Sequence, residues 1–266
     1  MQRNAFRHNG LTLSWLDSGG GGRLLIALHA HWMEALTFAR LASGLAPDWR
    51  VVALDQRGHG HSSRALSYTR EDYLSDLEAF FGELGVSSPV VLLGNSLGGI
   101  NAVQFASRHP ERVAAIIIED IGLECSTDLG FVRAWAGIFP TREALAERVG
   151  PRFKPYLESS FRAVLGGWSL AFDPEDMIRS ENAMHGNYWN DWLATKCPAL
   201  VIRGRDSRVT TRKQLEEMAH RRLNSVFIEL EGGHIVHQDS PEAFVAELRS
   251  FLQSLQPGTM NSSEQH

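Results

Sequence analysis

Short runs of apolar residues alternate along the chain with longer segments in which apolar residues recur at the spacing of a helix. The apolar runs are continuous rather than alternating, which is typical of parallel strands covered on both faces. These strand-like runs lie at 24–28, 51–54, 90–93, 113–118, 199–202 and 226–230. The helix-like segments lie at 34–45, 70–84, 97–109, 212–223 and 241–255. This order predicts an α/β fold with a mostly parallel open sheet flanked by helices.

The alternation of strand and helix stops in the middle of the chain, where the residues are helical in character and rich in aromatic side chains. We expect residues 123–195 to form an α-helical cap that is inserted into the fold and lies over the sheet. Residues 1–122 and 196–256 then form the core. The polar residues 257–266 are expected to be a disordered tail.

The charge balance narrows the classes of ligand. The chain has 26 Lys and Arg against 31 Asp and Glu, a net charge of −5, whereas nucleic-acid binders usually carry a basic excess. Its two cysteines are too few for a disulfide framework, which favours a reducing compartment. No signal peptide or membrane span is recognisable. We therefore expect a cytoplasmic protein that acts on a small molecule, without nucleic acid or membrane, as a monomer or a homodimer.

One motif carries a specific chemistry. Residues 94–98 read Gly-Asn-Ser-Leu-Gly, between a strand-like run and a helix-like segment. This strand–turn–helix setting is what the nucleophile elbow of a serine hydrolase requires. Ser96 is therefore the candidate nucleophile, held at the start of a helix where backbone N–H groups favour a developing negative charge.

A serine hydroxyl needs a base, and the base needs an acid that orients it. His234 follows the last strand-like run and is the candidate base, with His237 as its competitor. Asp206 follows the run at 199–202 and is the preferred acid, with Asp120 as the alternative. The chain order Ser96, Asp206, His234 is the order of nucleophile, acid and base in an α/β-hydrolase.

Several motifs together resemble the α/β-hydrolase fold family, and more narrowly its capped esterases, carbon–carbon bond hydrolases and cofactor-free haloperoxidase-like enzymes. The resemblance extends to about Gln256. It rests on Leu28-His29 and on the motifs at 55–62, 94–99, 204–206, 233–234 and 240–242. It implies that the aromatic insertion is a cap and that no cofactor is needed.

The resemblance also implies an oxyanion hole made by the backbone N–H groups of Leu97 and His31. This chain has Ala30 where the family usually has glycine. His29 and Trp32 would border the substrate pocket together with Phe131 and Trp135 of the cap, because an apolar layer over a cleft is a typical pocket wall. The His-x-His sequences at 29–31 and 59–61 lack the further ligands of a metal site, so we expect no metal.

These residues predict a serine hydrolase that cleaves a small ester-like substrate through an acyl-enzyme. Two alternatives use the same three side chains: cleavage of a carbon–carbon bond and peroxyacid chemistry of the haloperoxidase-like kind. A third alternative is a ligand receptor built on the same fold.

Overall fold

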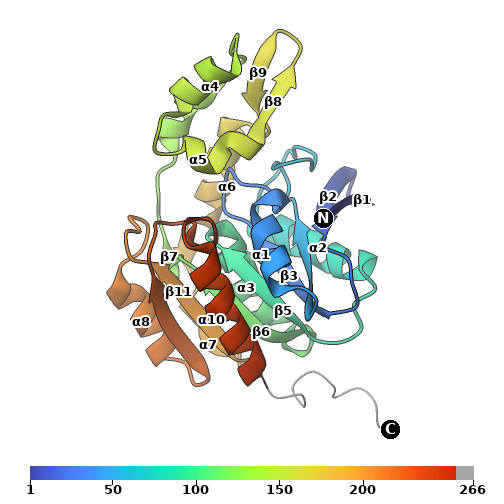
Figure 1. Ribbon diagram of the computed structural model, residues 1–266, viewed down its shortest axis with the longest axis vertical. Helices are drawn as coiled ribbons and strands as arrows, with labels where there is room; N and C mark the ends of the chain where they lie inside the picture. Colours follow the sequence, from blue (N-terminus) through green and yellow to red (C-terminus); the bar gives the residue numbers. More distant parts are fainter. Residues whose placement is uncertain (256–266) are drawn as a thin grey trace.

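A computed structural model describes residues 1–255 of the chain and contains a central sheet of eight strands (Figure 1). In spatial order the strands are β1 (Gln2–His8), β2 (Leu11–Asp17), β4 (Trp49–Leu54), β3 (Arg23–Leu28), β5 (Val90–Asn95), β6 (Val113–Glu119), β11 (Ala199–Gly204) and β12 (Ser225–Leu230). The strands from β4 to β12 run parallel, so the predicted α/β fold is confirmed. The continuous apolar runs did not predict the antiparallel pair β1 and β2, because these strands are only partly buried.

Helices cover both faces of the sheet. Alternate residues of β4, β3, β5, β6 and β11 belong to two separate apolar clusters, one on each face. One face carries α1 (Ala39–Leu45) and α10 (Pro241–Ser254), and the other carries α2 (Arg70–Glu83), α3 (Leu97–Arg108) and α8 (Arg212–His220). Burial on both faces explains why these strands read as continuous apolar runs.

The segment between β6 and β11, predicted as an α-helical insertion, contains short strands as well as helices. It comprises the following elements: β7 (Glu124–Cys125), the 3-10 helix η3 (Gly130–Trp135), α4 (Arg142–Val149), α5 (Lys154–Leu157), β8 (Phe161–Val164), β9 (Gly167–Leu170), α6 (Pro174–Met184), β10 (Gly186–Asn187) and α7 (Trp189–Ala194). Helices α4 and α5 and the hairpin of β8 and β9 extend away from the sheet (Figure 1). The hairpin is four residues per strand, too short to stand out as a periodic pattern.

The two ends of this segment pack differently. Residues from Leu129 to Ile178 form an apolar cluster with Ala30, Met33 and Ile235 of the surrounding loops. By contrast, Trp192 of α7 lies fully buried in the cluster beneath the sheet, and its indole N–H donates to the Met218 carbonyl at 2.9 Å. Helix α7 is thus part of the layer that contains α3, although its residues follow the inserted elements in sequence.

Helix α3 packs so closely on the sheet that a side chain has no room at the contact. A Cβ at Gly98 would lie 2.2 Å from the carbonyl oxygen of Leu28 at the end of β3, and a Cβ at Gly94 would lie 2.2 Å from the carbonyl oxygen of Gly98. These two glycines therefore fix how deeply the start of α3 sits between β3 and β5.

A matched pair of substitutions tests this packing. Gly98→Ala should lower the free energy of unfolding by about 1–3 kcal/mol, because the added carbon collides with backbone that cannot move aside. Gly82→Ala, in α2, meets no atom within 4 Å and should raise it by roughly 0.5–1 kcal/mol, the ordinary gain of alanine over glycine in a helix. Urea unfolding of both variants measures the difference, and equal shifts would contradict the close contact.

Candidate active site

Three residues with strained backbone lie beyond the carboxyl ends of neighbouring strands. Trp32 follows β3, Ser96 follows β5 and Asp120 follows β6, with φ values of 70°, 52° and 49°. A positive φ is uncommon for residues other than glycine and costs of the order of 1–3 kcal/mol each. Such strain concentrates at functional sites, and here it marks the edge of the sheet where parallel α/β folds place their ligands.

Ser96 stands at the turn between β5 and α3 with φ 52° and ψ −115°, as the sequence motif predicts for a nucleophile elbow. Its backbone N–H donates to the Glu119 carbonyl of the neighbouring strand at 3.1 Å, which anchors the turn. In the described part of the chain, the backbone N–H of Leu97 donates to no protein acceptor. The first turn of α3 therefore offers a free donor beside the serine.

His234 contacts Asp120, and the expectation that Asp206 holds this imidazole was wrong. Nδ1 of His234 lies 2.7 Å from Oδ2 of Asp120, which is completely buried. Asp206 is exposed, and its backbone N–H donates to the Gly232 carbonyl. The loop after β12 packs directly against the end of β11, where a Cβ at Gly204 would lie 1.9 Å from the Gly233 carbonyl oxygen. Because of this close packing, His234 extends past β11 to the end of β6.

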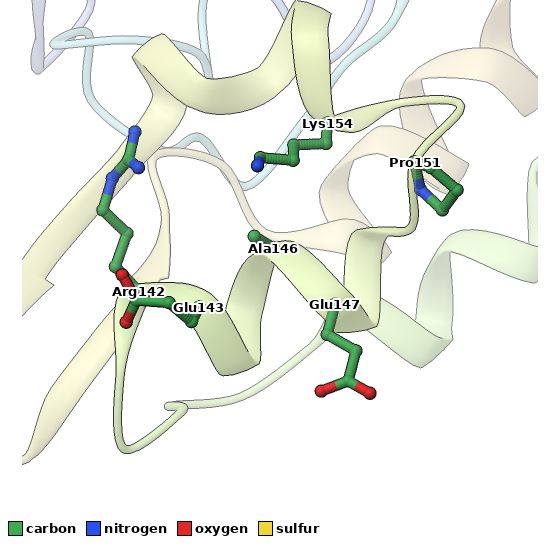
Figure 2. Close-up of a pocket in the computed structure, with 6 residues that line it drawn as sticks. All are labelled: Arg142, Glu143, Ala146, Glu147, Pro151 and Lys154. Carbon is green, nitrogen blue, oxygen red and sulfur yellow. The ribbon is translucent and has the colours of Figure 1, made fainter.

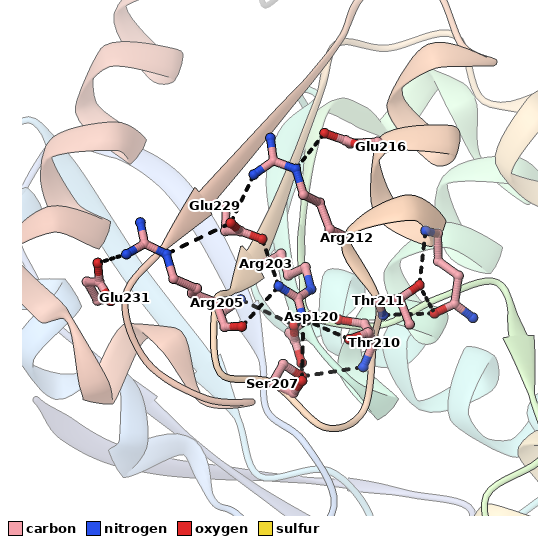
Figure 3. Close-up of polar contacts among 12 residues, drawn as sticks. Asp120, Arg203, Arg205, Ser207, Thr210, Thr211, Arg212, Glu216, Glu229 and Glu231 are labelled. Carbon is pink, nitrogen blue, oxygen red and sulfur yellow. Dashed lines mark hydrogen bonds and ion pairs between the residues drawn. The ribbon is translucent and has the colours of Figure 1, made fainter.

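The loop that contains Asp206 supplies hydrogen-bond donors to Asp120 instead of a competing acid. Oδ1 of Asp120 accepts from the Thr210 hydroxyl at 2.8 Å and from the Gly204 N–H at 3.3 Å, and Oδ2 accepts from the Ser207 hydroxyl. Figure 3 shows the contacts of Asp120 with Ser207 and Thr210 together with Arg203, whose guanidinium donates to the Thr210 carbonyl at 3.1 Å and pairs with Glu229 at 2.7 Å. A carboxylate with this many donors is held in one orientation and stays compatible with burial.

His237, the competing histidine, belongs to a second acid–imidazole pair. Its Nδ1 lies 2.8 Å from Oε2 of Glu119, its backbone N–H donates to Oε1 of the same carboxylate, and its Nε2 lies 2.6 Å from the Thr37 hydroxyl. Both side chains of the pair are buried, and the His237 ring stacks on Phe38 at 4.7 Å. Two adjacent acids at the end of β6 thus hold two histidines of the same loop.

His29, predicted to border the substrate pocket, is enclosed by the backbone of the loops around it. It is completely buried, Nδ1 faces the Ala30 carbonyl at 2.8 Å, and Nε2 accepts from the Gln56 backbone N–H at 3.0 Å. Both ring nitrogens are therefore occupied by backbone. Burial lowers the pKa of His29 to about 4, so the ring is neutral and links the loops after β3 and β4.

The other predicted pocket residues come together at the boundary between the inserted segment and the sheet. The Trp32 ring contacts Trp135 at 5.4 Å and Phe131 at 6.0 Å between ring centres, and Phe153 completes the group. Trp135 is buried, whereas Phe131 is half exposed at 49%. Three of these four aromatic residues were predicted from the sequence, and Phe153 was not.

A surface hollow of about 340 Å³ lies between α4 and α5 (Figure 2). Its lining includes Arg142 and Lys154, which both pair with Glu158, and it contains none of the candidate site residues. Its lining contains no serine, threonine or cysteine, and it is separate from the candidate active site. Within residues 1–255, no three His, Cys, Asp or Glu side chains are grouped so as to bind a metal ion, and no helix is long and apolar enough to span a membrane.

A family model described as the alpha/beta hydrolase family matches residues 18–247. This chain belongs to the alpha/beta hydrolase family. It is 24% identical to 2-(acetamidomethylene)succinate hydrolase of Mesorhizobium japonicum, over 88% of this chain and 89% of that protein. It is 27% identical to esterase Rv0045c of Mycobacterium tuberculosis, over 90% of this chain and 86% of that protein.

A solved structure of E-2-(acetamidomethylene)succinate hydrolase superimposes with a TM-score of 0.85 at 22% identity, covering 95% of this chain and all of that one. At this identity the superposition shows the shared fold. Together with the family match and the hydrolase names of the relatives, it identifies the chain as an enzyme of the hydrolase class.

A buried polar cluster links the core of this hydrolase to α6. Nε2 of His31 lies 2.8 Å from the Ser180 hydroxyl, which also contacts the Tyr73 hydroxyl at 2.7 Å, and Nδ1 of His31 lies 3.3 Å from Oε2 of Glu181. Burial lowers the pKa of His31 well below its ordinary value and raises that of Glu181 to about 7. Near neutral pH the His31 ring is therefore uncharged and Glu181 is partly protonated.

The raised pKa of Glu181 makes the stability of the hydrolase depend on pH. Because the pKa is about 7 in the folded state against 4.5 ordinarily, the folded state binds more protons, and this contribution to stability is lost as pH rises from about 5 to 8. In the unaltered enzyme this group should lower the free energy of unfolding by about 2–3 kcal/mol between pH 5 and pH 8, and Glu181→Gln should abolish that decrease. Urea unfolding at pH 5 and pH 8 measures it.

The matched control is Glu175→Gln, which removes an exposed carboxylate from the same helix. This control should follow the pH dependence of the unaltered enzyme. If Glu181→Gln also follows it, the Glu181 carboxyl does not titrate near neutrality.

Proposed function

We propose that this enzyme is a serine hydrolase in which Ser96, His234 and Asp120 form the catalytic triad. The contact that carries the proposal is the 2.7 Å pairing of His234 Nδ1 with buried Asp120, on the same edge of the sheet as the Ser96 turn. Asp120 fixes the tautomer in which Nδ1 bears the proton, which leaves Nε2 free to act as a base. The remaining donors to Asp120 keep it from rotating away.

In the proposed reaction, the Ser96 hydroxyl attacks the substrate carbonyl while His234 takes the serine proton. The backbone N–H groups of Leu97 and His31 stabilise the resulting oxyanion. His234 then gives the proton to the leaving group, and an acyl-enzyme forms. Water activated by the same imidazole attacks the acyl-enzyme, releases the acid and restores the Ser96 hydroxyl.

The proposed substrate is a small molecule with an ester-like acyl group. The relatives named above include an esterase and a hydrolase of an acetamido compound, and both names describe cleavage of an acyl derivative by water. The aromatic group of Trp32, Phe131, Trp135 and Phe153 supplies the apolar surface that we assign to the wall beside the acyl chain.

Replacement of the nucleophile tests the reaction type. Ser96→Ala should reduce kcat for p-nitrophenyl acetate by roughly 10⁴-fold or more, because no other side chain is proposed to form the acyl-enzyme. Thermal unfolding should show that the variant remains folded. Hydrolysis by Ser96→Ala at the rate of the unaltered enzyme would refute the proposed role of Ser96.

A comparison of two aspartates tests the choice of acid. Asp120→Asn should lower kcat by roughly 10⁴-fold, because an amide cannot stabilise the imidazolium or select the required tautomer. Asp206→Asn removes an exposed carboxylate that does not contact His234 and should retain nearly full kcat. Steady-state kinetics with p-nitrophenyl acetate distinguish the two, and the reverse result would restore Asp206 as the acid.

A further inference from the structure

Arg70, at the start of α2, has a buried nitrogen with no partner. Its Nε donates to the Gln104 side-chain oxygen at 2.9 Å and its Nη2 donates to the Asn101 side-chain oxygen. Its Nη1 is covered by protein, yet it makes no hydrogen bond to the described residues. No carboxylate of residues 1–255 lies within ion-pair distance of this guanidinium, although the salt bridges of the structure include many other arginines.

An unpaired N–H on a covered cationic side chain is unfavourable, because it loses its interactions with water and gains none in return. Folded proteins pair the great majority of buried polar groups, and the exceptions call for an explanation. The two amide oxygens fix the plane of the guanidinium, so Nη1 has a defined direction. Nη1 is therefore a fixed donor that has no acceptor among the described residues.

The position of Arg70 connects it to the candidate active site. The centre of its guanidinium lies 5.4 Å from the ring centre of Tyr73, whose hydroxyl contacts Ser180, and Ser180 in turn contacts His31. Asn101, its partner on α3, lies five residues after Ser96. Arg70 thus borders the buried polar cluster that also includes the proposed oxyanion donor.

The charges around this cluster leave Arg70 without a full counter-charge. Burial raises the pKa of Glu181 to about 7, although the nearby His185, His234 and Arg70 lower it in part. His31 is kept neutral, since burial above all, and also the neighbouring His59 and Arg70, lower its pKa. Below neutral pH the cluster therefore carries the uncompensated positive charge of Arg70.

We propose that Arg70 Nη1 binds a carboxylate of the substrate, so that the enzyme prefers acyl compounds that carry a second, anionic carboxyl group. This inference rests on the proposed hydrolase reaction and specifies its substrate class. One unpaired guanidinium nitrogen near a protonatable Glu181 suits a singly charged carboxylate, because a phosphate monoester would bring up to two charges to a single cation.

Two esters of one diacid test the preference. Monomethyl succinate carries a free carboxylate, whereas dimethyl succinate has the same acyl chain without the charge, and release of acid from each is followed by titration. The unaltered enzyme should show a higher kcat/KM for the monoester. Arg70→Gln should reduce the ratio of the two kcat/KM values at least tenfold, and Arg70→Lys, which keeps the charge, should reduce it less.

The matched control is Arg108→Gln, which removes an exposed arginine of α3 that pairs with Glu71, and should leave the ratio unchanged. An equal ratio in the unaltered enzyme and Arg70→Gln would overturn the carboxylate site while leaving the hydrolase reaction intact. Failure of the unaltered enzyme to cleave any ester would instead count against the proposed function.

A measurement on the unaltered enzyme covers the case in which the Arg70 variants do not fold. Hydrolysis of p-nitrophenyl acetate is followed in the presence of succinate or of succinamide, which has a similar shape without charge. Succinate should inhibit competitively, with an inhibition constant at least tenfold lower than that of succinamide. Inhibition by succinate that is no stronger than by succinamide would overturn the inference.

Discussion

The pairing of His234 with Asp120 is the interaction on which the arrangement of the candidate site depends. It joins the loop after β12 to the end of β6, across the end of the intervening strand β11. A hydrogen bond between an imidazole and a buried carboxylate is strong and directional, but only if the carboxylate cannot turn away. Ser207, Thr210 and Gly204 provide that restraint, and Arg203 holds the loop that contains them.

The buried pair of Glu119 and His237 works beside this interaction. It connects the same strand end to the short helix Val236–Asp239 that follows His234, and the Thr37 hydroxyl extends it to the 3-10 helix Ala35–Phe38 after β3. Breaking a buried pair of this kind leaves a charge or a polar group without a partner, which is costly. The loop that carries His234 is consequently fixed at two neighbouring points, and its imidazole is oriented before any substrate binds.

The contact between α6 and the core is different, because burial favours the uncharged forms of its titratable groups. His31, Ser180, Tyr73 and Glu181 form a continuous set of contacts in which burial disfavours the charged forms of His31 and Glu181. Arg70 is the cation that borders this set. The inserted segment therefore does more than cover the sheet, since it supplies Ser180 and Glu181 to the surroundings of the proposed oxyanion donor.

The sequence by itself determined the parallel sheet, the flanking helices and the turn at Ser96, because continuous apolar runs and a Gly-x-Ser-x-Gly motif depend on neighbours in the chain. It also predicted an acid after β11 or β6 and favoured Asp206, whereas the folded chain pairs His234 with Asp120. Asp120 and Asp206 each follow a buried strand, and the choice depends on how far the loop after β12 reaches past β11. The buried state of His29 and the unpaired nitrogen of Arg70 were likewise decided by tertiary packing, because each depends on residues far away in the chain that only folding brings into contact.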